Sequence, residues 1–336
     1  MNTGLNDLLE KFVALGGIVD NVCQKEGEFG RGIFPIDPSR RSEVMTPVNL
    51  LINRDNLAIY EGEILIKDKT CFASEESAFI EMYYNDYSWG NNGNSDSINY
   101  LKFISTTSQS VKHALVGHGF VSNSILGFDD SPQCVFERFV DERAFKFEGD
   151  IVLAPVMELL NHSAYASPFR VVSGGLRSPL FQETSSELLH KYSGKNSSMS
   201  IWSKYGFACR CIVAYSVPLK IEIKNESLCI SCLGRFGMGP NDDQSFSLVG
   251  DSISIKSLPV GCLSPGLPFA AFNSILCSVG LSADVAKRLF PKVLELNLKA
   301  RRDLLGLLQE PGFGAQAELY KALAYEIDLI EASLVG

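Results

Sequence analysis

The sequence predicts an α+β protein, with a β-rich body of about 220 residues that is interrupted by helices and followed by a mostly helical part of about 115 residues. Three observations predict it. The chain has 336 residues, which gives room for about two domains at roughly 150 residues each. Apolar residues make up 46% and charged residues 21%, the balance of a folded protein with a sizeable core. Short runs with strand character fill the first part, whereas long amphipathic patterns end the chain.

The first residues predict a helix and then strands. Apolar side chains from Leu5 to Val13 fall on one helical face, and Gly16-Gly17 ends that helix. The runs at 18–24, 32–36 and 57–66 have strand character and are separated by Gly, Pro and Asn. We therefore expect the body to open with a helix and β structure.

A helical insert is predicted at about 74–149. Its candidate helices are 74–84, 108–117 and 134–145. The polar stretch 89–97 has no apolar residue after Trp89, which predicts a surface loop.

After Gly149 the pattern returns to strands and then becomes helical. Strand character marks 151–163, 169–174 and 209–225, and the alternation at 245–258 predicts a hairpin. Long amphipathic helices are expected at 281–309 and 314–335, with Ser282 as an N-cap and Pro291 as a kink or break. The uncharged stretch 258–283 contains prolines, which favour a loop and a buried helix over a membrane span.

Charge and cysteine content limit the partners and the compartment. The net charge of −9 disfavours a phosphate backbone as the main partner and suits a cationic protein segment. Nine scattered cysteines indicate a reducing compartment, and the polar N-terminus does not resemble a signal peptide. We expect a cytoplasmic monomer without a direct nucleic-acid or membrane partner; nuclear localisation or export as an effector stays open.

Three short motifs could carry chemistry. Gly30-Arg31-Gly32 would let the backbone approach a ligand closely, or it is a plain hairpin turn. Glu158 to Ser163 places Asn161-His162 after a buried segment, where both could bind a heteroaromatic ring or serve structure alone. Tyr192 and Tyr205, thirteen residues apart, could share one pocket or be two half-buried tyrosines.

Taken together, the order GxG, then xxxNHS, then Y(x)12YGF resembles the SET-domain protein methyltransferases, in particular the class of the Rubisco large-subunit lysine methyltransferase. The motifs reach from Gly30 to Phe207, more than half of the chain. The resemblance implies a β-rich SET fold at 1–220, with the helical insert at about 74–149, and a C-terminal β segment and helical substrate-docking domain at 221–336. Lys195, Asn196 and Ser197 match the polar turn that separates the two tyrosines in the family.

The resemblance also implies roles for individual residues. Tyr192 would be catalytic, while Tyr205 and Phe207 would close the pocket for the cofactor and the substrate lysine. Arg143, in a stretch similar to the family's (S)RAF, would contact the carboxylate of the cofactor. S-adenosylmethionine would be held by Gly30, Arg31, Gly32, Ile33, Arg143, Glu158, Asn161, His162 and Tyr205. Glu158 departs from the usual Asp, Ser193 departs from the usual Gly or Asp, and the short insert puts the substrate in doubt.

The expected function is therefore methyl transfer from S-adenosylmethionine to a lysine amine of a protein substrate. Two alternatives stay open: a histidine imidazole as the acceptor, or an inactive SET-like binding module. Cys209, Cys211, Cys229 and Cys232 could supply thiolates to one zinc ion. Because these cysteines fall in apolar runs, buried core roles are favoured and no metal is expected.

Overall fold

The computed structural model describes residues 3–27, 30–181, 184–192, 196–223, 228–232, 246–249, 251–310 and 312–335. Its mixture of helices and antiparallel sheets, with a helical C-terminal region, confirms the α+β class. Ser193 and Lys195, two positions of the expected polar turn, lie outside the described residues.

The chain divides into two compact units that are both discontinuous in sequence. Unit 1 comprises residues 1–98 and 130–194, and unit 2 comprises 99–129 and 195–336. The predicted insert at 74–149 is therefore shared between the two units. The functional division at residue 220 stays a prediction.

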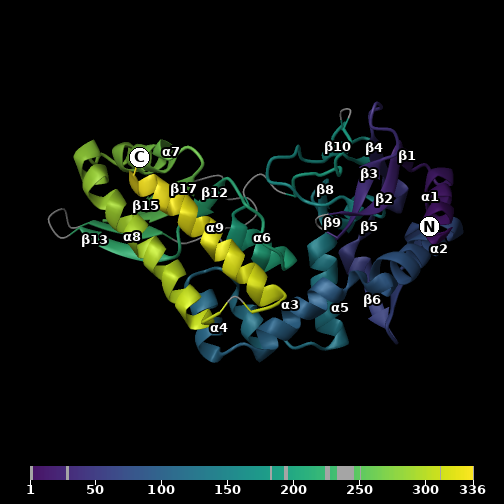
Figure 1. Cartoon of the computed structure of the whole chain (residues 1–336), viewed down its shortest axis with the longest axis horizontal. Coiled ribbons are helices and arrows are strands. Elements are labelled where there is room, and N and C mark those ends of the chain that lie inside the picture. Colours follow the sequence, from purple (N-terminus) through teal and green to yellow (C-terminus); the bar gives the residue numbers. More distant parts are fainter. Residues whose placement is uncertain are drawn as a thin grey trace. The chain divides into compact units, whose positions relative to one another are not determined.

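Unit 1 opens with the predicted helix and small sheets (Figure 1). Helix α1 (Thr3–Ala14) buries Leu8 and Phe12 and ends before Gly16, whose φ of +95° favours glycine. Its sheets are ordered β1-β4-β11-β10, β2-β3, β5-β9-β8 and β6-β7. The strands are β1 (Ile18–Asp20), β2 (Val22–Gly27), β3 (Gly30–Pro35), β4 (Glu43–Pro47), β5 (Ile52–Asn53), β6 (Leu57–Tyr60), β7 (Glu63–Ile66), β8 (Phe145–Phe147), β9 (Asp150–Leu153), β10 (Arg170–Val172) and β11 (Gly175–Arg177).

The helices of unit 1 are α2 (Ser74–Met82), a π-helix labelled η4 (Tyr83–Gly93) and α5 (Pro132–Arg143). The prediction of a surface loop at 89–97 is wrong. Trp89 is buried against Phe136 and Phe139, and its Nε1 donates to the Gly62 carbonyl at 2.9 Å. Aromatic packing therefore outweighs the polar composition of this stretch.

The same stretch leads into a helix that the sequence pattern does not predict, α3 (Ser95–Thr106). It buries Tyr100, Leu101 and Ile104, which follow helical spacing. The Asn- and Gly-rich residues before it mask this pattern in the sequence.

Unit 2 packs helices against two further sheets. Its other helices are α4 (Gln109–Gly117), α6 (Ser198–Tyr205), α7 (Gly266–Ser278), α8 (Ala283–Leu308) and α9 (Ala315–Val335), with α8 and α9 side by side (Figure 1). Its strands are β12 (Val213–Tyr215), β13 (Leu219–Ile223), β14 (Leu228–Cys232), β15 (Phe246–Val249), β16 (Ser252–Ile255) and β17 (Pro259–Cys262), ordered β13-β14-β16-β15 and β12-β17. The shared core includes Ile230, Ile253, Phe272, Phe290 and Leu294.

Short 3-10 turns complete the description: η1 (Val48–Leu50), η2 (Arg54–Asn56), η3 (Lys69–Cys71), η5 (Asn123–Gly127) and η6 (Met157–Leu159). The last of them corrects the strand expected at 151–163, because β9 stops at Leu153 and a turn follows. Val156, with a φ of +68°, redirects the chain between the two.

Two further expectations in unit 2 need correction. α8 continues through Pro291, so the break does not occur, while the kink stays a prediction. The neighbours Phe290 and Val293 are buried, and tertiary packing holds the helix on both sides of the proline. Within the described part of the run at 209–225, strands form at 213–215 and 219–223, because the Ser198 hydroxyl donates to the Cys209 carbonyl at 2.7 Å and ties the start of the segment to α6. Residues 224 and 225 lie outside the described residues.

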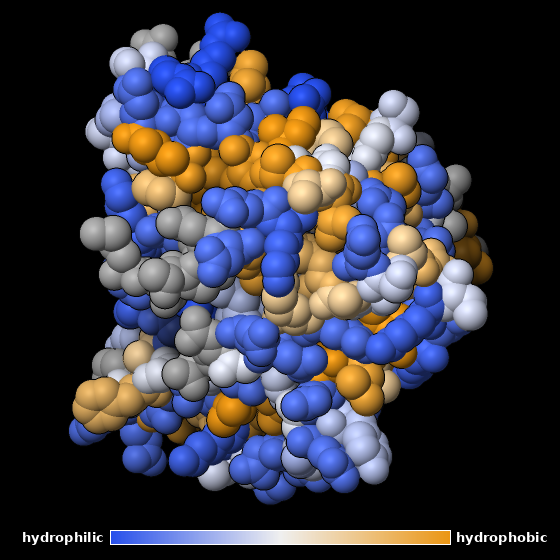
Figure 2. Space-filling view, turned by 90° about the vertical axis from the view of Figure 1, so that its right-hand side faces the viewer, coloured by the Kyte–Doolittle hydropathy of each residue, from blue (hydrophilic) through white to orange (hydrophobic). Residues whose placement is uncertain are grey.

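Hydrophilic side chains cover much of the face in Figure 2, and a band of hydrophobic ones crosses its upper part. Exposed apolar side chains of unit 1 include Ile36 and Tyr60, at 66% and 64% exposure. Such exposure is a normal part of protein surfaces. Within the described ranges, no helix has the length and apolar character needed to cross a bilayer.

Candidate functional site

The first motif lies on the β2–β3 hairpin, with Gly30-Arg31-Gly32 opening β3 and not forming the expected turn. The two glycines serve different needs. Gly30 has a φ of +85°, and a Cβ added there would meet nothing within 4 Å, so this glycine is required for conformation. A Cβ on Gly32 would lie 1.9 Å from Oε1 of Glu187 and 3.1 Å from Nδ2 of Asn161, so Gly32 is required for space. Ile33 is buried beside it, and its carbonyl accepts from the Leu188 N–H at 2.8 Å.

Asn161 joins three segments that are far apart in the sequence. Its Nδ2 donates to the Arg31 carbonyl at 3.1 Å and to Oε1 of Glu187 at 2.6 Å. Its own carbonyl accepts from the His190 N–H at 3.0 Å. The second motif therefore sits directly between the GxG strand and the segment that leads to Tyr192.

Two buried histidines flank Tyr192. The Tyr192 N–H donates to Nδ1 of His162 at 3.1 Å, so that nitrogen is an acceptor. The ring centroids of His162 and His190 lie 4.7 and 4.8 Å from that of Tyr192. Burial lowers the pKa of His190 to about 3, with the nearby His162 acting in the same direction. His190 is thus neutral at physiological pH and serves as part of an apolar wall.

The Tyr192 hydroxyl donates to the Leu160 carbonyl at 3.3 Å. Burial raises the pKa of this phenol well above its ordinary value, and the carboxylates of Glu158, Glu142 and Glu187 also raise it. Arg143 opposes these effects. The phenol therefore stays protonated at neutral pH and can donate or accept a hydrogen bond.

Glu158 points its carboxyl at the π-helix of unit 1. The Tyr83 hydroxyl donates to Oε1 at 3.1 Å, the Ser88 hydroxyl donates to the same oxygen at 2.5 Å, and Tyr84 also interacts with the carboxyl. Burial raises the pKa of Glu158, while the charge of Arg143 and the hydroxyls lower it in part. Glu158 thus faces hydroxyl groups in an interior that favours the neutral acid.

Arg143 and Arg31 bring positive charge to the same interior. The Arg143 guanidinium lies 4.0 Å from the ring centroid of Phe139, and its Nη1 is 3.5 Å from Glu142. The Arg31 guanidinium lies 5.7 Å from the ring centroid of Tyr87. Burial raises the pKa of Tyr87 to about 12, although Arg31 opposes that shift. Both arginines suit an anionic group of a ligand.

The remaining predicted residues belong to unit 2. Tyr205 ends α6, Gly206 follows with a φ of +80°, and the rings of Tyr205 and Phe207 are 6.1 Å apart. Nζ of Lys204 lies 5.0 Å from the Tyr205 ring centroid. Their closure of a pocket around Tyr192 stays a prediction.

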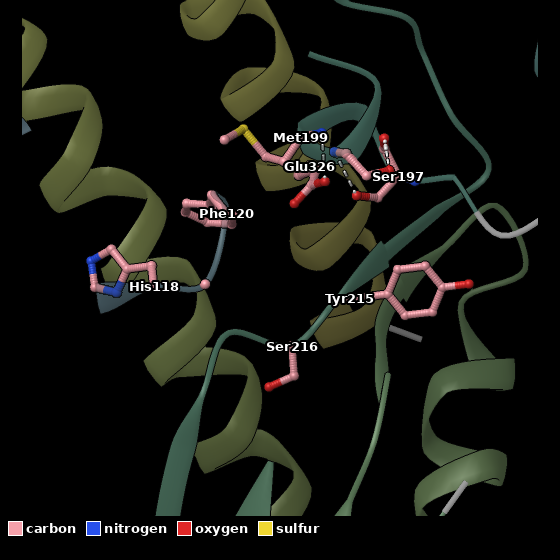
Figure 3. A pocket seen from close by; sticks show the side chains of 9 residues that line it. His118, Phe120, Ser197, Met199, Tyr215, Ser216 and Glu326 are labelled. Atoms are coloured by element: carbon pink, nitrogen blue, oxygen red, sulfur yellow. Dashed lines mark hydrogen bonds between the residues drawn. The ribbon is translucent and has the colours of Figure 1, made fainter. Parts of the chain in front are cut away.

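Unit 2 has a cavity of its own, of about 20 Å³, which has room for roughly one water molecule (Figure 3). The Met199 N–H donates to Oε1 of Glu326 at its wall, at 2.9 Å. Its lining comprises His118, Gly119, Phe120, Ser197, Met199, Ser200, Tyr215, Ser216 and Glu326. A cavity of this size is too small for a cofactor.

The cysteines weighed as zinc ligands lie in unit 2. Cys211 and Cys232 are buried, and Cys209 and Cys229 are partly buried. Across the residues that the structure describes, no group of three or more His, Cys, Asp or Glu side chains could hold a metal ion.

Sequence reasoning missed Glu187, Ser88 and the tyrosines of the π-helix. Glu187 stands in a polar stretch that resembles an ordinary loop. The spacing of Gly27, Gly30 and Gly32 is the signal that could have revealed a side chain lying on the hairpin.

Comparisons with known proteins leave the family open. No family model matches the chain, and no curated protein matches it. Among solved structures, it is similar to the SET domain of LSMT bound to lysine and AdoHcy, with 13% identity, a TM-score of 0.44 and coverage of 100% of this chain and 91% of that one. It is also similar to Rubisco LSMT bound to AdoMet, with 15% identity, a TM-score of 0.45 and coverage of 100% and 92%.

Proposed function

We propose that the chain is an S-adenosylmethionine-dependent protein methyltransferase of the SET type, which transfers a methyl group to a lysine side-chain amine. One observation carries the proposal. The three motif segments, at 30–33, 158–163 and 187–192, meet in unit 1 through hydrogen bonds of Asn161 and His162. A ligand site is expected to bring together polar residues from segments that are distant in the sequence, and these three motif segments meet in that way.

The residues present fit the amino-acid end of the proposed cofactor. The bare backbone of Gly32, the Arg31 carbonyl and the Asn161 amide form a cradle, in which the Glu187 carboxylate lies where a Cβ of residue 32 would be. Arg143 offers a fork of donors that suits a carboxylate. When bound, the cofactor would supply an electrophilic methyl group on a sulfonium sulfur.

Tyr192 would align the incoming amine and would not act as the base. Its hydroxyl is buried, protonated at neutral pH and anchored on the Leu160 carbonyl at 3.3 Å. A lysine amine must lose its proton before it attacks, at a cost of roughly 4 to 5 kcal/mol at pH 7. A neighbouring cation and a dry pocket both lower the pKa of an ammonium, so a dedicated carboxylate base is unnecessary.

Two further residues, both in unit 2, belong to the proposal through the motif order alone. Tyr205 and Phe207 present aromatic faces that suit a methylated ammonium. The helices from about Pro268 onward would dock the protein substrate, in the cytoplasm and as a monomer. These assignments extend the proposal and follow from the motif order.

The experiment that tests the proposal combines cofactor binding with methyl transfer. The chain should bind S-adenosylmethionine in calorimetry and should label a lysate protein from the tritiated cofactor, with label recovered as methyllysine. Asn161→Ala should weaken cofactor binding, whereas Asn123→Ala, an exposed asparagine of unit 2, should not. Absence of both binding and label would refute the enzyme hypothesis and favour a binding module. Label recovered as methylhistidine would change the acceptor.

A further inference from the structure

The strongest unassigned feature of unit 1 is Glu187, whose carboxylate lies over Gly27 and Gly32 of the β2–β3 hairpin. Alternation along the strands places Gly27, Gly30 and Gly32 on that one face, since Gly27 pairs with Gly30 and Lys25 pairs with Gly32. A Cβ on Gly32 would lie 1.9 Å from Oε1 of Glu187, and one on Gly27 would lie 2.8 Å from Oε2. Both carboxylate oxygens thus occupy space that any other residue would fill.

The backbone that follows Glu187 is fixed by two hydrogen bonds. The Leu188 N–H donates to the Ile33 carbonyl at 2.8 Å, and the His190 N–H donates to the Asn161 carbonyl at 3.0 Å. Two hydrogen bonds within three residues hold this segment between β3 and the second motif. The hydrogen bonds of Leu188 and His190 therefore hold the chain directly after Glu187 close to the hairpin and to the second motif.

The groups around this carboxylate favour a cation. Nδ2 of Asn161 donates to Oε1 at 2.6 Å and also to the Arg31 carbonyl at 3.1 Å, so these two oxygens share one small region. A carboxylate oxygen beside a backbone carbonyl oxygen offers acceptors and negative charge to the same ligand group. An ammonium group, with three donors and one positive charge, matches that set.

The charge of this carboxylate also acts on Tyr192. Glu187 is among the carboxylates that raise the pKa of the Tyr192 hydroxyl, so its charge reaches that group. A ligand group bound at Glu187 would thus lie within electrostatic range of the Tyr192 hydroxyl.

We propose that the Glu187 carboxylate and the Arg31 carbonyl, both held in place by the Asn161 amide, bind the α-ammonium group of the methyl donor. This inference rests on the proposed function and adds an anionic binding residue that the sequence motifs do not contain. The carboxylate selects ligands that carry an amino group at this position. It also explains why Gly27 and Gly32 are both bare.

The test compares two ligands on three proteins by calorimetry. The ligands are S-adenosylhomocysteine and its deaminated analogue, in which hydrogen replaces the amino group. The proteins are the unmodified chain, Glu187→Gln and the control Glu26→Gln, an exposed glutamate on the opposite face of the same hairpin. Thermal unfolding of each variant checks that it is folded.

Glu187→Gln should weaken binding of S-adenosylhomocysteine by about tenfold or more, the usual effect of losing one charge-assisted hydrogen bond. The same variant should leave binding of the deaminated analogue unchanged, and Glu26→Gln should leave both unchanged. The two ligands and the two proteins form a thermodynamic cycle. The ammonium contact is measured by how much the effect of Glu187→Gln differs between the two ligands.

Other outcomes overturn the inference. Equal loss of both ligands would give Glu187 a structural role only. Tighter binding by Glu187→Gln would show that the carboxylate competes with an anionic part of the ligand. If Glu187→Gln does not fold, Glu187→Ala replaces it, and an unchanged preference for the amino group would then contradict the inference. A chain that binds neither ligand would remove the proposed function itself, a result distinct from the others.

Discussion

Each unit buries a glutamate, and the two are satisfied in different ways. In unit 2, Nε and Nη2 of Arg301 donate to Oε2 of Glu326 at 2.9 and 2.6 Å, and both side chains are almost completely buried. In unit 1, the Glu158 carboxyl accepts hydrogen bonds from the hydroxyls of Tyr83 and Ser88 at 3.1 and 2.5 Å. Two acids of the same type thus meet a fixed charge in one place and neutral donors in the other.

The different partners of the two glutamates suggest a structural role for Glu326 and a chemical role for Glu158. Arg301 also donates to the Asn297 and Tyr215 carbonyls, so the ion pair ties together α8, α9 and β12. A buried ion pair whose hydrogen bonds are all made can hold the elements that carry it in one arrangement. A buried carboxyl held by hydroxyls can exist with or without its proton, and such groups gather near functional sites. We therefore infer that Glu326 stabilises the fold and that Glu158 has a protonation state that its surroundings can change.

Removing one partner of the ion pair should have the largest effect. Arg301→Met leaves the Glu326 charge buried without its partner and should lower the free energy of unfolding by about 3 to 5 kcal/mol. The matched control is Arg302→Met, whose ion pair with Glu331 is exposed and should be worth at most about 1 kcal/mol. Urea titration measures both. Equal effects would erase the distinction between the two positions.

Tyr192→Phe should affect turnover and leave stability nearly intact. Loss of the hydroxyl misplaces the amine, and we expect the methylation rate to fall by about 100-fold with little change in cofactor affinity. Tyr165→Phe is the control, since Tyr165 is 65% exposed. A fully active Tyr192→Phe enzyme would refute the catalytic assignment.

Gly32→Ala should distinguish space from conformation on the hairpin. The added Cβ would lie 1.9 Å from Glu187, so the carboxylate must move, at a cost of roughly 1 to 3 kcal/mol of stability and with weaker cofactor binding. Gly30→Ala meets no neighbour but strains a φ of +85°, which should cost roughly 1 to 2 kcal/mol without the binding effect. Calorimetry and urea unfolding of both variants measure the contrast. If both variants lose affinity equally, the proposed cradle is wrong.

Glu158→Gln should produce the smallest and most pH-dependent change. The folded-state pKa of Glu158 is raised above its ordinary value of 4.5, so the folded chain holds this proton more tightly than the unfolded chain. That stabilisation is complete below pH 4.5 and is lost as the pH rises through the folded-state pKa. The stability of the unmodified chain relative to Glu158→Gln should therefore fall with rising pH, by at most about 1.4 kcal/mol per pH unit.

Urea unfolding at several values between about pH 4 and pH 8 measures this slope. Glu63→Gln, an exposed change on β7, should give no comparable slope. A difference that does not vary with pH would show that Glu158 titrates alike in both states.

The sequence predicts the parts of this fold that local pattern determines. The hairpin of β6 and β7, helix α1 and the long helices α8 and α9 follow from periodicity and turn residues. Helix α3 escapes prediction because its buried residues, Tyr100, Leu101 and Ile104, follow a polar run. The π-helix does not follow from a 3.6-residue period, since its backbone repeats differently.

In the candidate site, too, the residues that stand in a local motif are predicted and those brought in by tertiary structure are not. Asn161 and Tyr192 are predicted because their motifs stand together in the sequence. Glu187 approaches Gly32 across about 155 residues, and only tertiary structure brings such residues together. The contacts of Ser88 and Tyr83 with Glu158 depend on the π-helix, so they too could not be predicted from the sequence.

The pairing of β4 with β11 has a consequence for synthesis of the chain. Thr46 pairs with Leu176, and residues 99–129 of unit 2 leave the ribosome between these two strands. The N-terminal strands must therefore wait for a late partner, while α4 waits for α8. Neither unit can be completed before the other has begun, so a fragment that ends near residue 220 would strand α4 without its partner helix. During synthesis, a chain that ends before β11 thus exposes the unpaired edge of β4, and the fold is completed only when α8 and α9 have been made.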